Sequence, residues 1–78
     1  MQRIERAFGA AVRHRRELLS VSQEDFANLA GIHRTYVSSI ELGKVQVSIG
    51  IAFKLAAALD MPLSKLWRDV EARLAEPA

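Results

Sequence analysis

The stretch that decides the fold is residues 22–44, SQEDFANLAGIHRTYVSSIELGK. It predicts two short helices, over residues 23–30 and 34–42. Ser22 precedes the first helix, where its hydroxyl can accept a hydrogen bond from a free backbone amide. Gly31 ends that helix, because glycine adopts a left-handed conformation without a steric penalty. Two helices of this length, joined by a short glycine turn, have the proportions of a helix-turn-helix unit.

Three further helices are predicted outside this stretch. Apolar residues at three- and four-residue spacing predict one helix over residues 3–19 and another over residues 49–59. Pro62 ends the second of these, because proline disfavours helical geometry in the residue before it. Ser64 is expected to cap a fifth helix. We therefore predict an all-α fold, a compact five-helix bundle in which residues 1–75 form one domain and residues 76–78 are a frayed tail.

Length and composition limit the classes of protein. The chain has 78 residues, 50% of them hydrophobic, and no cysteine, so we expect one small folded domain without disulfides or thiolate metal ligands. The longest apolar run, residues 55–59, is far below the roughly 18 residues of a membrane span. The Arg-rich residues 1–16 lack the features of a targeting segment, because Glu5 interrupts them and no apolar core follows. The sequence predicts a cytoplasmic protein without a membrane partner.

The net charge is weak but unevenly placed. Lys and Arg number 11 against 9 Asp and Glu, which gives a formal charge of +2 at pH 7. The whole surplus lies within residues 1–46, the part that holds the helix-turn-helix unit. A basic face is compatible with this distribution, although total charge does not establish one.

The predicted helix over residues 34–42 has two different sides. At 100° per residue its inward side carries His33, Val37, Ile40 and Glu41. The outward side is small and hydrogen-bonding, with Thr35, Ser38, Ser39 and Leu42, and Arg34 and Tyr36 flank it. Short hydroxyl side chains allow close approach to a DNA major groove, where an arginine can bond guanine O6 and N7. An ordinary solvated polar surface is the alternative.

Glu41 helps to decide between a DNA-binding helix and an ordinary solvated one. A carboxylate beside Val37 and Ile40 loses part of its hydration unless a cation meets it. Arg16 or Arg13, late in the first helix, is the expected partner.

The ordered combination of these residues resembles the XRE-type, λ-repressor-like helix-turn-helix family over residues 8–68. The residues that carry the resemblance are Val12, Arg13, Arg16, Ser22 to Ala27, Ala30 to Ile32, Val37, Ser38, Ile40, Glu41, Gly43, Lys44, Leu55, Ala56 and Leu59. Within that family, residues 34–41 and the single-domain size resemble the controller proteins of restriction–modification systems. A phage or mobile-element repressor and the DNA-binding antitoxin of a toxin–antitoxin pair are the alternatives.

The resemblance implies a sequence-specific transcription regulator that binds double-stranded operator DNA as a homodimer. It implies base contacts by Arg34, Thr35, Ser38 and Ser39. It places Ser22, Gln23, Gly43 and Lys44 at the DNA backbone, Tyr36 at the groove wall, and an ion pair between Arg16 and Glu41. It also gives Glu24 and Asp25 a contact with RNA polymerase as an alternative to simple stabilisation of the helix N-terminus. Two departures stand out: His33 replaces the usual Ser, Thr or Asp cap, and residues 45–47 lack polar or basic character.

Helix five is expected to have two tasks. Leu63, Leu66 and Trp67 are predicted to be core. Val70 and Leu74 extend the apolar stripe further, and we expect them to form an isologous dimer contact together with the neighbouring end of the helix over residues 49–59. The alternative is a helix end that lies back on its own core.

Two other features carry less chemistry. The basic cluster of residues 13–16 could contact phosphate or be merely solvated. The histidines, His14 and His33, lie in different predicted helices, so no metal-binding pair is evident. We predict no enzyme, no catalytic residues, no metal or other cofactor, and no small-molecule ligand.

Overall fold

The computed structural model describes residues 2–76, which form five helices and no strand. The helices are α1 (Gln2–Leu18), α2 (Gln23–Ala30), α3 (Arg34–Glu41), α4 (Ile49–Ala58) and α5 (Leu63–Ala75). The predicted all-α five-helix fold is confirmed, and the predicted boundaries are correct to within one residue for the first four helices. Of the predicted tail, residues 77–78 lie outside the described residues, and the amide of Glu76 donates to the carbonyl of Arg73.

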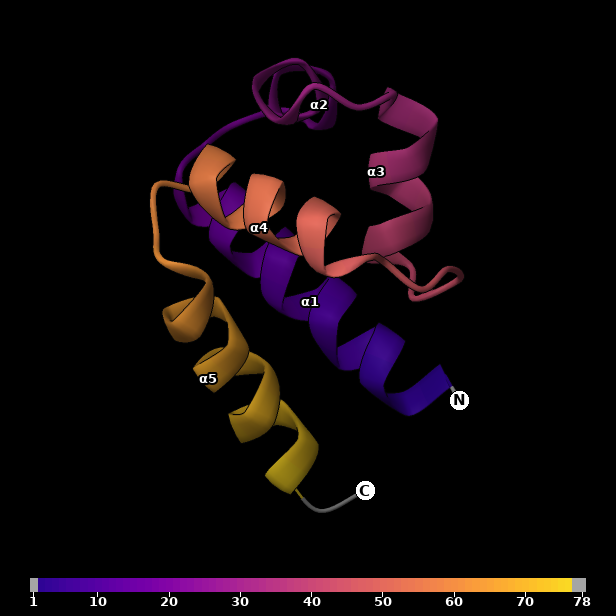
Figure 1. Ribbon diagram of the computed structural model, residues 1–78, viewed down its shortest axis with the longest axis vertical. Helices are drawn as coiled ribbons and strands as arrows, with labels where there is room; N and C mark the ends of the chain where they lie inside the picture. Colours follow the sequence, from indigo (N-terminus) through magenta and orange to yellow (C-terminus); the bar gives the residue numbers. More distant parts are fainter. Residues whose placement is uncertain (1, 77–78) are drawn as a thin grey trace.

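The long helix α1 is the centre of the bundle. It packs against α3 on one side and α5 on the other, while α2 packs against α3 and α4. Figure 1 shows α4 in front of the C-terminal half of α1, with α2 and α3 at one end of the molecule and α5 at the other. The helix-turn-helix unit formed by α2 and α3 therefore packs against α1 and α4.

Local capping explains where most helices begin and end. The hydroxyl of Ser22 accepts from the amide of Asp25 at 3.0 Å, and that of Ser48 accepts from Ile51 at 3.1 Å. Gly31 follows α2 in the left-handed conformation, with φ +71°. Helix α5 differs from its prediction, because Ser64 does not cap it. The helix begins at Leu63, and the carbonyl of Pro62 accepts the first helical hydrogen bonds.

The core is a single apolar cluster to which every helix contributes. Its largest fully buried side chains are Val12, Phe26, Val37, Ile40, Leu55, Leu59, Leu66 and Val70. Val70 is 0% exposed within one chain, which corrects the prediction that it forms a dimer contact. Leu74 is half-buried and packs against the same cluster. Val70 therefore lies back on its own core, whereas a dimer contact by Leu74 stays a prediction.

Trp67 is more exposed than the sequence predicts, whereas Val70 is more buried. Trp67 was expected in the core but is 41% exposed. It borders a groove whose walls also include Ile4, Val47 and Ile49. The apolar stripe of α5 is thus wider than the surface that the bundle covers.

Candidate nucleic-acid interface

The two sides of α3 differ as the sequence predicts. Val37, Ile40 and Glu41 are buried, whereas Arg34 and Thr35 are exposed. Leu42, directly after the helix, is 54% exposed. Ser38 and Ser39 are half-buried, and so is Tyr36, which packs against the core. The exposed surface of α3 therefore combines one guanidinium group with small hydroxyl side chains.

His33 caps the N-terminus of α3. It was expected on the inward side, but the side chain is exposed. Its Nδ1 accepts a hydrogen bond from the amide of Thr35 at 3.2 Å and lies 2.6 Å from the hydroxyl of the same residue. An imidazole nitrogen thus does the work of the usual Ser, Thr or Asp oxygen. It also fixes Thr35 at the exposed start of the helix.

A buried ion pair ties α1 to α3. The Nε of Arg16 donates to Glu41 Oε2 at 2.7 Å and its Nη2 donates to Oε1 at 3.0 Å, a two-bond geometry that favours arginine. The two side chains are only 11% and 2% exposed. The prediction that Glu41 pairs with a cation of the first helix is confirmed, and that cation is Arg16 rather than Arg13.

The ion pair extends into a small network. Arg16 Nη1 donates to the carbonyl of Val21 at 2.8 Å, which fixes the turn before α2. Gln23 Nε2 donates to Glu41 Oε1 at 3.0 Å. The hydrogen bonds that Arg16 donates to Glu41 raise the pKa of Arg16 above its ordinary value, although burial opposes this shift. Arg16 therefore stays charged, and one carboxylate holds α1, the start of α2 and the end of α3 together.

Gln23 belongs to this network in addition to its predicted role. The sequence places it at a phosphate, and the structure shows its amide bound to Glu41. The amide nitrogen has a second hydrogen, so a phosphate contact stays a prediction that is compatible with this geometry. No sequence pattern predicts the Gln23–Glu41 hydrogen bond, because it depends on how α2 packs against α3.

The chain turns sharply after α3. Gly43 has φ +73°, and its amide donates to the carbonyl of Ile40 at 3.0 Å. Lys44 is exposed beside it. A Cβ atom at position 43 would lie 2.7 Å from the Cγ of Arg6, so α1 approaches this turn closely. No sequence pattern distinguishes Arg6 from the other arginines, because its place beside this turn depends on the crossing of α1 and α3.

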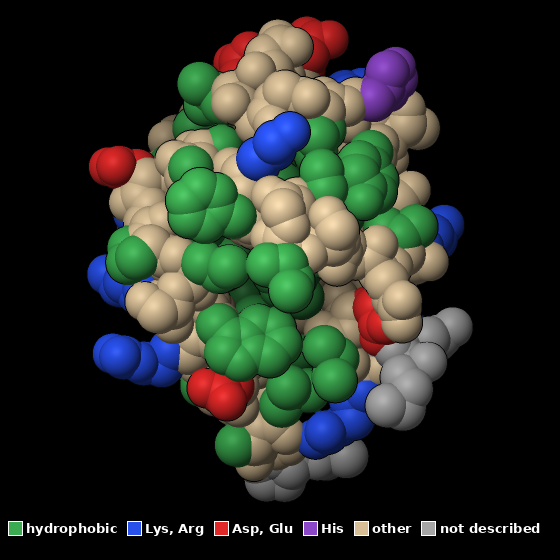
Figure 2. Space-filling model, viewed as in Figure 1, with side chains coloured by type: hydrophobic (Ala, Val, Ile, Leu, Met, Phe, Trp, Pro, Cys, Tyr) green, Lys and Arg blue, Asp and Glu red, His purple; other side chains and the backbone are tan. Residues whose placement is uncertain are grey.

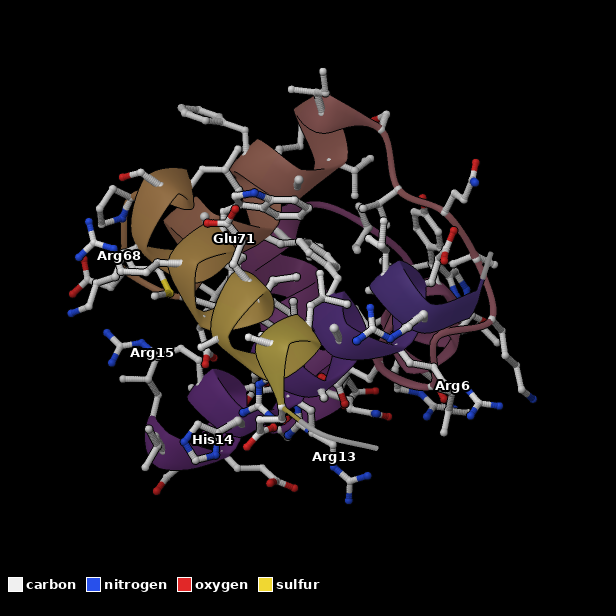
Figure 3. The ribbon with its side chains drawn as sticks, turned by 90° about the horizontal axis from the view of Figure 1, so that it is seen from below. Arg6, Arg13, His14, Arg15, Arg68 and Glu71 are labelled. Carbon is white, nitrogen blue, oxygen red and sulfur yellow. The ribbon has the colours of Figure 1, made fainter. Side chains whose placement is uncertain are left out.

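The basic cluster of residues 13–16 does not form one surface. Arg16 is buried in the ion pair with Glu41. Arg13 pairs with Glu17 at 3.1 Å, and Arg15 Nε donates to the carbonyl of Leu59 at 3.2 Å. Figure 3 shows Arg13, His14 and Arg15 directed to different parts of the surface. Three of the four members thus have partners within the chain.

Among residues 2–76, no three side chains of His, Cys, Asp or Glu are grouped so that they could hold a metal ion. In the same residues, no helix is both long and apolar enough to span a membrane.

The geometry defines a helix-turn-helix protein, in which α2 and α3 form the unit and α3 presents an exposed polar face. A family model described as helix-turn-helix matches residues 12–66. The chain is 46% identical over 57 residues to control protein C.MunI of a Mycoplasma species, which covers 73% of this chain and 77% of that protein. It is 38% identical over 55 residues to control protein C.SmaI of Serratia marcescens, covering 70% and 66%. The chain belongs to the helix-turn-helix family of DNA-binding control proteins.

Solved structures support the same assignment. The restriction-modification controller protein C.AhdI of Aeromonas hydrophila superposes with a TM-score of 0.77 and 39% identity, over 80% of this chain and 94% of that one. The clp gene regulator ClgR of Corynebacterium glutamicum reaches a TM-score of 0.89 over 92% of this chain and 77% of that one. Its identity is 24%, so this second likeness shows the fold alone.

Proposed function

We propose that this protein is the controller of a restriction–modification system, a homodimeric transcription regulator that binds operator DNA with α3 in the major groove. The main support for the proposal is the exposed polar face of α3. The buried Arg16–Glu41 pair fixes α3 against α1 so that this face points to solvent. The similarity to control proteins supports the biological role. The protein would act in the bacterial cytoplasm on nucleoid DNA.

The assignment of side chains to DNA follows from their position. Arg34 and Thr35 at the start of α3, with Ser38 and Ser39 a turn later, are proposed to contact base edges. Ser22, Gln23, Gly43 and Lys44 are proposed to contact the backbone, with Tyr36 at the groove wall. Base contacts carry the sequence preference, whereas backbone contacts fix the orientation.

Selection of bound duplexes from a random pool tests the proposal. We expect enrichment of one sequence with two symmetric half-sites, one or two helical turns apart, because a two-fold dimer reads DNA symmetrically. Failure to enrich any sequence would contradict the proposal. Neighbouring genes for an endonuclease and a methyltransferase would support the restriction–modification role, whereas a toxin gene or phage genes would contradict it.

Arg34 is expected to make the strongest base contact. Replacing it with alanine should weaken operator binding by about 1–3 kcal/mol and relax the preference at one position of each half-site. The measurement is the affinity for the selected duplex and for its single-position variants. Lys65→Ala is the matched control, because it removes one exposed positive charge from α5. Equal effects of the two changes would contradict a base contact by Arg34.

An apolar surface on α4 and α5 is the proposed dimer interface. Ile49, Phe53 and Trp67 are 84%, 65% and 41% exposed, and Figure 2 shows hydrophobic side chains gathered on this face. A groove of about 480 Å³ opens beside it, with Leu63 and Trp67 in its wall. Monomeric proteins rarely expose a large contiguous apolar patch, and a second copy of the chain would cover this one symmetrically.

Phe53→Glu is expected to dissociate the dimer, because it places a charge in the proposed interface. Sedimentation equilibrium at micromolar concentration measures the effect. Leu29→Glu is the matched control, because Leu29 is also 65% exposed but lies on α2. We expect a monomer for the first variant and a dimer for the second. A wild-type molecular mass for Phe53→Glu would place the interface elsewhere.

The acidic pair at the start of α2 is a second candidate for protein contact. Glu24 and Asp25 are exposed in the first turn, where negative charge also stabilises the positive end of the helix dipole. Because Ser22 already caps this helix, the two carboxylates remain accessible. We propose that they contact RNA polymerase when the protein acts as an activator.

A further inference from the structure

The side chain of Arg6 begins beside the turn that ends α3. A Cβ atom at Gly43 would lie 2.7 Å from Arg6 Cγ and 2.8 Å from Arg6 Cα. The same turn is held by the amide of Lys44, which donates to the carbonyl of Ser39 at 3.0 Å. The base of the Arg6 side chain is therefore positioned next to Gly43 and Lys44.

The guanidinium group of Arg6 is available for a ligand. Arg6 is exposed, and no ion pair of Arg6 occurs among the residues that the structure describes. In contrast, Arg13, Arg16 and Arg73 each pair with a carboxylate of this chain. Figure 3 shows Arg6 extending from α1 on a different side of the molecule from Arg15 and Arg68.

The loop after α3 has no positive charge beyond Lys44. Residues 45–47 are Val, Gln and Val. Both valines are partly buried and pack against the core, where they also line the groove next to Trp67. These loop residues pack against the bundle, so a second cation beside Lys44 would have to come from another element.

We propose that Arg6 and Lys44 together bind a phosphate of the operator backbone at the C-terminal end of α3. The proposal rests on the proposed function, because it requires α3 to lie in the major groove. Arginine suits the task, since its planar group presents paired donors to phosphate oxygens. Helix α1 then takes part in DNA binding through Arg6, while Arg16 of the same helix only positions α3.

The salt dependence of operator affinity tests the proposal. Each lost ion pair with a phosphate lowers the magnitude of the slope of log affinity against log salt by about 0.9. A two-fold dimer carries two copies of Arg6, so the magnitude should fall by about 1.8, which corresponds to about sixtyfold weaker binding near 0.1 M salt. We expect this effect for Arg6→Gln and a largely retained slope for Arg6→Lys, which keeps the charge. Arg68→Gln is the matched control, because it removes one exposed charge from α5, away from Arg6.

The outcomes separate this inference from the proposed function. Wild-type protein without salt-dependent duplex binding would overturn both. If the wild type binds and Arg6→Gln keeps the slope of Arg68→Gln, only the phosphate contact is overturned. A changed base preference in Arg6→Gln would also overturn it, because a backbone contact affects all sequences alike. Thermal melting shows whether each variant is folded during the titration.

Discussion

Replacing Glu41 with alanine is expected to lower the free energy of unfolding by about 3–5 kcal/mol, because it leaves a buried charge without its partner. The side chain of Arg16 is 11% exposed and gives two hydrogen bonds to Glu41. After the substitution its remaining acceptor in the described residues is the carbonyl of Val21. Gln23 loses its partner in the same step. The loss therefore weakens the joints of α3 with α1 and with α2.

Urea denaturation of three variants measures this effect. Glu17→Ala is the matched control, because it breaks the Arg13–Glu17 pair, whose side chains are 58% and 54% exposed. Exposed pairs contribute about 0–1 kcal/mol, so the control should unfold close to the wild type. The double variant Arg16→Met/Glu41→Leu should recover part of the loss, because it removes both buried charges. Equal midpoints for Glu41→Ala and Glu17→Ala would contradict the assignment.

Glu41→Ala should change DNA binding only through the lower stability of the fold. Glu41 is buried and lies on the inward side of α3, so it does not face the proposed DNA groove. At a temperature where Glu41→Ala is folded, its sequence preference should match that of the wild type. A shifted preference would show that Glu41 contributes to base readout.

The helices could be predicted from sequence because their signals are local. Ser22, Gly31 and Ser48 each act on amides or dihedral angles within three residues of their own position. The pairing of Glu41 was also predictable, since an inward carboxylate on an apolar face requires a cation. The apolar pattern alone does not choose between Arg13 and Arg16, because that choice depends on the rotation of α1 against α3. The family resemblance indicated Arg16, and the structure shows this pair.

The covered part of an apolar stripe could not be predicted. Leu66 and Val70 are one helical turn apart and both are fully buried, whereas Trp67 is 41% exposed. All three belong to the apolar side of α5. The axis along which α5 lies on α1 decides which edge is covered, and that axis is a property of the whole bundle. Thus Val70 was wrongly assigned to the dimer contact and Trp67 to the core.

One residue of the sequence does indicate the close approach of α1 and α3. Glycine inside a helix is less favourable than alanine by about 0.5–1 kcal/mol, so an interior glycine suggests a close approach of another backbone. Gly9 is such a residue, and the structure shows its neighbour. A Cβ atom at this position would lie 2.7 Å from the carbonyl oxygen of Glu41 and would also clash with that of Ile40.

Gly9→Ala is the second change with a large expected effect. The added methyl group meets backbone rather than a flexible side chain, so α1 must move away from α3. Overpacking of this kind costs about 1–3 kcal/mol, which exceeds the gain in helix propensity. The shift also displaces Arg16 from Glu41, and it displaces Arg6 from the turn at Gly43. We therefore expect reduced stability together with reduced operator affinity.

Gly50→Ala provides the control for the glycine change itself. Gly50 lies in the first turn of α4, where an added Cβ would have only the hydroxyl oxygen of Ser48 nearby, at 3.8 Å. This variant should be neutral or more stable than the wild type by up to about 1 kcal/mol. Urea denaturation and operator titration of both variants distinguish propensity from packing. If Gly9→Ala were stabilised like Gly50→Ala, the close backbone contact could not be what sets the position of α3.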